Sequence, residues 1–114
     1  MISNIQDGDK NLELKIIVLE EKGKYHFKNK TKSQMNMTQF LVAEITGSIL
    51  CNFYGEIADL LNPGDILFMT DAYCAIFQNS KILYCGKKGS IWRIGQFNLP
   101  FNETPFLSQP FSHS

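Results

Sequence analysis

The fold class follows from one segment in the middle of the chain, which reads SILCNFY at residues 48–54, GEIADLLN at 55–62 and PGDILFMT at 63–70. The first part alternates between apolar and polar residues, which predicts a half-buried strand. Its expected core-facing residues are Ile49, Cys51 and Phe53. The second part has apolar residues at helical spacing, and the Pro-Gly pair that follows ends it. This order of elements predicts a mostly β protein with one small helix.

The same alternation recurs on both sides of this segment. Residues 12–18 and 40–44 precede it, residues 73–77 and 82–85 follow it, and residues 66–70 at its end are a further expected strand. The connections between them are too short for the crossover helices that parallel strands need, so we expect antiparallel pairing. An alternating chain of this size removes its exposed strand edges by closing into a barrel. The predicted fold class is all-β, an OB-fold barrel of five to six antiparallel strands with one short helix.

The chain is long enough for one domain, because it has 114 residues. We assign residues 1–97 to the barrel, within which the polar, basic residues 25–33 predict a mobile loop. Residues 98–114 interleave proline with phenylalanine, which predicts an extended segment without regular structure. Such a segment fits either a partner protein or the surface of the barrel itself.

Composition excludes several classes of protein. Hydrophobic residues make up 44% of the chain and charged residues 19%, which is typical of a globular protein. The apolar runs are too short to cross a bilayer, and the N-terminus lacks the pattern of a secretory signal. Three cysteines without a C-x-x-C pair predict reduced thiols and no zinc site. We expect an intracellular protein without a cofactor or metal.

The charge of the chain is unevenly distributed. Eleven basic residues balance eleven acidic ones, but residues 22–32 contain five lysines and no acid. A local field steers a polyanion even when the whole protein is neutral. The three lysines Lys28, Lys30 and Lys32 are therefore candidate phosphate contacts, although a lysine run is also the ordinary composition of a solvated loop.

Large aromatic residues on the predicted strands are the candidate binding residues. Tyr73 and Phe77 share one face of their strand, and Cys74 and Ile76 share the other. The period does not fix which face is inside, but small side chains fill a narrow barrel better, and tyrosine hydroxyls favour water or a partner. Exposed rings beside lysines are typical of a surface that binds single-stranded nucleic acid. Catalytic constellations are lacking, so we expect a protein that is not an enzyme.

Several short motifs together resemble one family, the small single-stranded DNA-binding proteins of the SOSS (sensor of single-stranded DNA) complex. The motifs are KNL at 10–12, IVLE at 17–20, VAE at 42–44, TGSI at 46–49, NPGDI at 62–66, LYCG at 83–86 and IGQF at 94–97, with Tyr73 and Phe77 between them. The resemblance implies an OB-fold that binds single-stranded DNA in the nucleus, in damage sensing, double-strand-break repair and homologous recombination.

The resemblance also implies which residues contact DNA. The stacking positions of the family fall on Tyr54, Tyr73, Phe77 and Tyr84, and a basic position falls on Lys87. At residue 54 the family has tryptophan, so tyrosine here keeps a ring with less stacking area.

A second implication of the resemblance is a protein partner, a large helical scaffold similar to Integrator subunit three. The family docks through an Ile-Gly-Glu-Phe motif after the last strand, which here has glutamine in place of glutamate. The candidate partner-binding residues are Ile94, Gln96, Phe97 and Phe101. Two alternatives stay open: an OB protein that mainly docks on a scaffold and has weak affinity for DNA, and a protein that binds single-stranded RNA, because stacking does not sense the 2′-hydroxyl.

Overall fold

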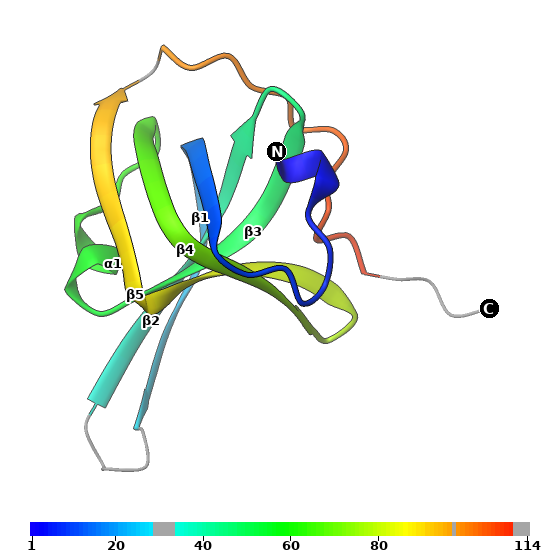
Figure 1. Ribbon diagram of the computed structural model, residues 1–114. Coiled ribbons are helices and arrows are strands. Elements are labelled where there is room, and N and C mark those ends of the chain that lie inside the picture. The colour runs from blue at the N-terminus through cyan, green and yellow to red at the C-terminus, as the bar shows by residue number, and fades with distance from the viewer. Residues whose placement is uncertain (29–33, 97, 111–114) are drawn as a thin grey trace.

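The computed structural model describes residues 1–28, 34–96 and 98–110, and its strands close into a barrel (Figure 1). The strands lie around the barrel in the order β1-β2-β3-β5-β4, and β4 pairs with β1. The elements are η1 (Ile2–Asn4), β1 (Leu12–Lys28), β2 (Gln34–Glu44), β3 (Gly47–Tyr54), α1 (Glu56–Leu60), β4 (Asp65–Phe77) and β5 (Ser80–Gln96). This confirms the predicted all-β OB-fold barrel with one short helix.

The core lies inside the barrel and is formed by one face of each strand. The predicted core residues of β3, Ile49, Cys51 and Phe53, are all fully buried. Phe53 meets Phe40 of β2 edge to face, with ring centroids 5.9 Å apart. Helix α1 adds Ala58 to the same cluster. Each fully buried large side chain stabilises the barrel by roughly 1.5–3 kcal/mol.

Two expectations about strand length and pairing are wrong. A loop was expected over residues 25–33, but residues 25–28 belong to β1. This strand pairs with β2 as far as Lys28↔Gln34. Strands β3 and β5 are parallel over Leu50↔Ile82 to Asn52↔Tyr84, whereas antiparallel pairing was expected throughout. After β3 the chain passes through α1 and then forms the β4–β5 hairpin. The second strand of this hairpin, β5, lies beside β3 and runs in the same direction.

The two strands expected over residues 66–70 and 73–77 are one bent strand, β4. The bend falls at Asp71, which has a φ of 56° and interrupts the register between Thr70 and Ala72. Such a bulge lets one strand serve two walls of the barrel. The first half of β4 pairs with β1, and the whole strand pairs with β5.

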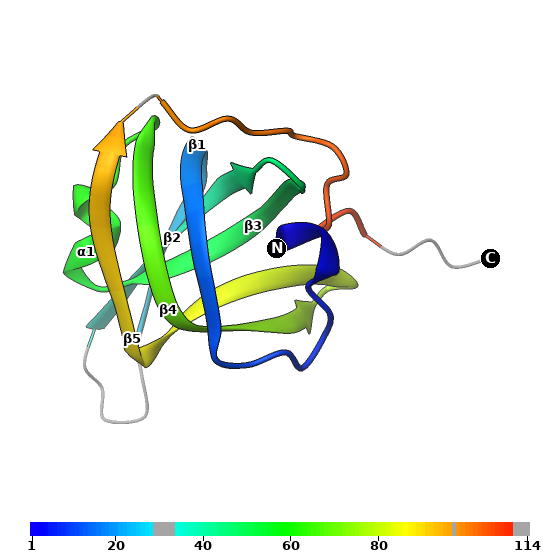
Figure 2. The same ribbon diagram turned by 45° about the horizontal axis from the view of Figure 1, so that its top comes forward.

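The described residues after β5 run along the barrel (Figure 2). The backbone of Ser48 donates to the carbonyl of Pro105 and accepts from the amide of Leu107, at 3.0 and 2.9 Å. Gly47 permits this close approach, because a Cβ there would lie 2.7 Å from the oxygen of Pro105. Ser108 is buried, and its hydroxyl accepts a hydrogen bond from the amide of Leu50. These contacts hold Pro105, Leu107 and Ser108 on the barrel surface.

A second, smaller cluster forms on the outside of the barrel under the same segment. Ile17 of β1, Ala43 of β2 and Ile66 of β4 are buried there, with Leu99 packed against them.

The described part of the chain contains no helix long and apolar enough to cross a membrane.

Candidate nucleic-acid interface

Three of the predicted stacking residues form one stack of rings on the outside of the barrel. Tyr84 of β5 lies in the middle, with its ring centroid 5.2 Å from that of Tyr73 on β4 and 6.5 Å from that of Tyr54 on β3. The planes are nearly parallel, at 14° and 15°. We call these three residues the tyrosine stack. Strands β3, β4 and β5 thus present one continuous aromatic surface.

Strand register explains why the rings meet. Tyr73 pairs with Tyr84 across β4 and β5, and Tyr84 pairs with Asn52 across β5 and β3. Residues paired in this way lie side by side on one face of a sheet. Asn52 is 5% exposed, and its side-chain oxygen accepts a hydrogen bond of 3.0 Å from Gln39 on β2. The stack therefore borders a fixed polar pair.

The face assignment made from the sequence is confirmed for the aromatic residues. Tyr73 and Phe77 are 38% and 59% exposed, whereas Cys74 between them is 2% exposed. The expectation that Ile76 is buried with Cys74 is wrong, because Ile76 lies near the hairpin end of β4 and is 36% exposed. Phe77 shares the face of Tyr73, but in the described part of the chain its ring stacks on no other.

The hydroxyls of Tyr54 and Tyr84 stay protonated to a higher pH than those of tyrosines in water. Burial raises the pKa of Tyr54 and of Tyr84, the neighbouring phenols raise it further, and a hydrogen bond with Asn52 opposes the shift in both. Neutral phenols do not repel phosphate. The surface therefore offers uncharged rings and hydroxyls to a polyanion at neutral pH.

We expect an alkaline titration to detect the raised pKa of Tyr54 and Tyr84. The folded pKa of Tyr54 and Tyr84 lies above the ordinary value of 10.0, so their contribution to stability falls as pH rises above that value. Absorbance of tyrosinate should show a late component in the folded protein. Tyr84→Phe should reduce this component, and an unchanged late component in that variant would contradict the assignment.

The structure describes only part of the predicted lysine contacts. Lys28 lies in β1 and Lys87 in β5, and their side chains are outside the described part. Lys30 and Lys32 lie outside the described residues. The two lysines that precede them along β1, Lys22 and Lys24, pair with Glu20 and Glu21 at 3.0 and 3.8 Å. These exposed pairs contribute little to stability.

Two aromatic surfaces escaped the sequence analysis. Tyr25 of β1 is 49% exposed, and it was assigned to a loop because its neighbours are polar and basic. Trp92 of β5 is 50% exposed and stacks on Phe68 of β4, with ring centroids 5.7 Å apart. The strand containing Trp92 was expected to end at residue 85, so the sequence predicted no exposed face at residue 92.

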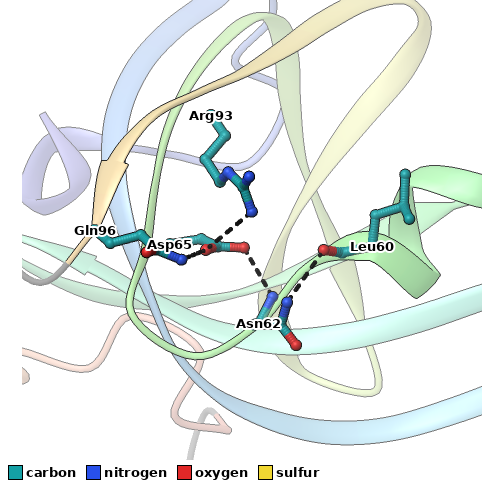
Figure 3. A network of polar contacts seen from close by, with 5 residues as sticks. All are labelled: Leu60, Asn62, Asp65, Arg93 and Gln96. Carbon is teal, nitrogen blue, oxygen red and sulfur yellow. Dashed lines mark hydrogen bonds and ion pairs between the residues drawn. The ribbon is translucent and has the colours of Figure 1, made fainter.

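The predicted partner-binding residues differ in their surroundings. Ile94 and Phe101 are exposed, and Phe97 lies outside the described residues. Gln96 is engaged within the protein, because its side-chain amide donates a 2.9 Å hydrogen bond to Asp65 (Figure 3). Asp65 is fully buried at the start of β4, accepts from the amide of Asn62 and lies 3.8 Å from the guanidinium of Arg93.

This contact predicts what a glutamate at position 96 would do. Gln96→Glu replaces a donor to a buried carboxylate with a second carboxylate, so we expect a loss of about 1–2 kcal/mol in the free energy of unfolding at pH 7. Urea denaturation of both proteins at pH 7 measures this loss. Equal stability of the two proteins at pH 7 would show that the contact is dispensable.

Comparison with known proteins places this geometry among proteins with the same fold. The family model for "Single-stranded DNA binding protein Ssb-like, OB fold" matches residues 7–93. A hypothetical protein from Arabidopsis thaliana has a similar structure, with a TM-score of 0.75 and 19% identity over 99% of this chain and 84% of that one.

Two further structures are similar. The replication factor A related protein from Methanobacterium thermoautotrophicum gives a TM-score of 0.68 and 16% identity, over 82% of this chain and 88% of that one. One chain of a replication protein A heterotrimer bound to single-stranded DNA gives a TM-score of 0.66 and 13% identity, over 90% of this chain and 26% of that chain.

Proposed function

Because the chain belongs to the family of Ssb-like single-stranded DNA binding proteins with an OB fold, we propose that it binds single-stranded DNA on the tyrosine stack. The observation that carries this proposal is the set of three parallel rings, with Tyr84 in contact with both neighbours and Tyr73 exposed to solvent. Bases stack on such rings with little regard to sequence, each stack contributing roughly 1–3 kcal/mol. The protein acts by binding and carries out no catalysis.

The proposed binding surface extends from the tyrosine stack along β4. Phe77 lies on the same face four residues from Tyr73 and is the most exposed of the four predicted rings. Lys28, Lys30, Lys32 and Lys87 supply the phosphate contacts in this proposal. Affinity should therefore fall with salt, by about 0.7 log units per log unit of salt for each phosphate that is neutralised.

The experiment that tests this function is a titration of labelled oligo-dT of about 30 nucleotides, a length that exceeds the 4–16 nucleotides typical of one OB fold. Fluorescence anisotropy is read at two salt concentrations, with a duplex and an oligo-rU of the same length as competitors. Salt-sensitive binding that prefers the single DNA strand supports the proposal. Equal affinity for oligo-rU supports the RNA alternative, and a folded protein that binds neither strand contradicts both.

We propose further that the chain works in the nucleus as part of a SOSS-like complex in DNA damage sensing and repair. The support is the resemblance of its short motifs to the DNA-binding proteins of that complex, together with exposed apolar residues near the end of β5. Trp92, Ile94 and Phe101 are between 41% and 52% exposed. This surface suits a scaffold similar to Integrator subunit three, because aromatic residues are enriched where proteins bind one another.

The same surface favours the second candidate function, a protein that docks on a scaffold and binds DNA weakly by itself. Ile94→Glu should abolish co-purification with the scaffold, whereas Ile76→Glu, at an exposed isoleucine near the hairpin end of β4, should not. Comparing oligo-dT affinity with and without the scaffold then separates the candidates. High affinity of the isolated chain supports DNA binding as its own function.

A further inference from the structure

The hairpin formed by β1 and β2 projects beyond the barrel as an arm (Figure 1). Its described pairing continues through Lys24↔Thr38 and Tyr25↔Met37. We call the residues 23–28 and 34–39 the arm. Tyr25 is 49% exposed, so its ring is not part of a core. An exposed aromatic residue on a protruding hairpin raises the question of which face of the sheet it occupies.

Register places Tyr25 on the face of the tyrosine stack. Tyr25 pairs with Met37 across β1 and β2, and Met37 pairs with Tyr54 across β2 and β3. Paired residues share a face, so the face of Tyr54 continues across β2 to Tyr25. Two strand spacings separate them, which is about 10 Å between backbones. The chain has four tyrosines, and all four lie on this face.

The ring of Tyr25 lies back along its strand toward the barrel. A Cβ built on Gly23 would be 2.9 Å from the hydroxyl oxygen of Tyr25 and 3.1 Å from two of its ring carbons. Gly23 pairs with Gln39, which donates to Asn52 beside Tyr84. Because glycine at residue 23 has no side chain, the ring of Tyr25 has room to lie back over Gly23, on the side of Gln39 and the tyrosine stack.

The neighbouring charges leave this face accessible. Lys22 and Lys24 occupy the positions that alternate with Gly23 and Tyr25, and they pair with Glu20 and Glu21. Along the sequence, residues 22–32 carry five lysines and no acid. An aromatic ring within a lysine-rich segment suits a nucleic-acid strand better than an apolar protein surface, because stacking and phosphate contacts occur together there.

We propose that Tyr25 is a further base-stacking residue, which carries the bound single strand from the barrel onto the arm. This inference rests on the proposed function and extends it. The tyrosine stack holds the bases nearest the barrel wall, and Tyr25 stacks a base beyond Tyr54. Gly23 is a positioning residue in this arrangement, since it sets where the ring lies.

The test compares Tyr25→Ala with Tyr25→Phe and Tyr25→Leu by anisotropy, using oligo-dT of two lengths near the limits of the range of about 4–16 nucleotides per OB fold. Tyr25→Ala should weaken binding of the long oligonucleotide about 5- to 100-fold and leave the short one nearly unchanged. Tyr25→Phe should bind like the natural protein, and Tyr25→Leu like Tyr25→Ala, because the ring and not apolar area is required. Ile45→Ala serves as the matched exposed control, and thermal melting verifies that each variant is folded.

A double-mutant cycle tests the role of Gly23. Gly23→Ala should weaken long-oligonucleotide binding when Tyr25 is present and add nothing when Tyr25→Ala is already in place. Additive effects would show that Gly23 does not act through the ring.

The outcomes separate this inference from the proposed function. If Tyr25→Ala binds both lengths like the natural protein while Tyr84→Ala loses affinity, the role of Tyr25 is overturned and the proposed function stands. If Tyr25→Ala loses only scaffold binding, the arm contacts protein and the inference is again overturned. If the natural protein binds neither length, the proposed function and this inference fail together.

Discussion

Replacing Tyr84 by alanine should weaken oligo-dT binding at least about tenfold, because it removes one stacking surface and disturbs two further rings. Tyr84 is the central member of the tyrosine stack, and its ring contacts both Tyr54 and Tyr73. Its removal eliminates one stacking surface and leaves the other two rings without the neighbour that fixes their orientation. The two remaining rings must then become ordered when DNA binds, and this ordering costs conformational entropy in addition to the lost contact.

The matched control is Tyr84→Phe, which keeps the ring and loses only the hydroxyl. We expect its affinity to stay within about threefold of the natural protein, because stacking provides most of the binding energy. Fluorescence anisotropy at low salt measures both variants, and circular dichroism shows that they are folded. A folded Tyr84→Ala that retains full affinity would mean that DNA does not bind on the tyrosine stack.

Replacing Phe53 by alanine should destabilise the barrel by about 3–5 kcal/mol, as is usual for a buried phenylalanine. Phe53 is fully buried and packs against Phe40 in the centre of the core. Small domains have only about 5–15 kcal/mol of stability, so this change removes a large share of it. Urea denaturation followed by circular dichroism gives the difference.

The adjacent residue provides the comparison, since Tyr54 points to the opposite face of the same strand. Tyr54→Ala should cost less stability than Phe53→Ala and should weaken oligo-dT binding, which Phe53→Ala should affect only through unfolding. Reversed effects on stability would contradict the assignment of the two faces. The pair thus tests core and binding surface at consecutive positions.

The barrel could be predicted from the sequence because it depends on local alternation, and the exposure of Tyr73 followed from side-chain size and its hydroxyl once alternation had grouped the residues by face. Ile49, Cys51 and Phe53 alternate with Tyr54 and its neighbours, and this pattern fixes two faces without knowledge of the partner strands. The contact between Tyr54, Tyr73 and Tyr84 could not be predicted in this way. It depends on the parallel register of β3 and β5, which long-range packing determines.

The residues that the sequence analysis missed share a physical cause. Tyr25 and Trp92 lie where long strands continue past bulges, and a bulge interrupts the alternation used to find a strand. Composition also misled, because the lysines around Tyr25 are typical of loops. Pairing with β2 keeps this segment extended despite its polar composition.

Gln96 illustrates a different limit of sequence comparison. The resemblance treated it as a docking position that had lost a charge. In the structure its amide binds buried Asp65, which also accepts from the backbone of Asn62. Exchanging glutamine and glutamate at residue 96 thus alters a contact inside the protein as well as the predicted docking surface. Its effects on stability and on partner binding need separate measurements.

The segment after β5 has a consequence for solubility. Strand β3 pairs with β5 only from Leu50 onward, so its first residues would expose backbone donors and acceptors on that side. The bridge between Ser48 and Phe106 occupies these groups. Exposed strand edges pair readily with other chains. A protein shortened at residue 97 should therefore self-associate through β3, even where its barrel still folds.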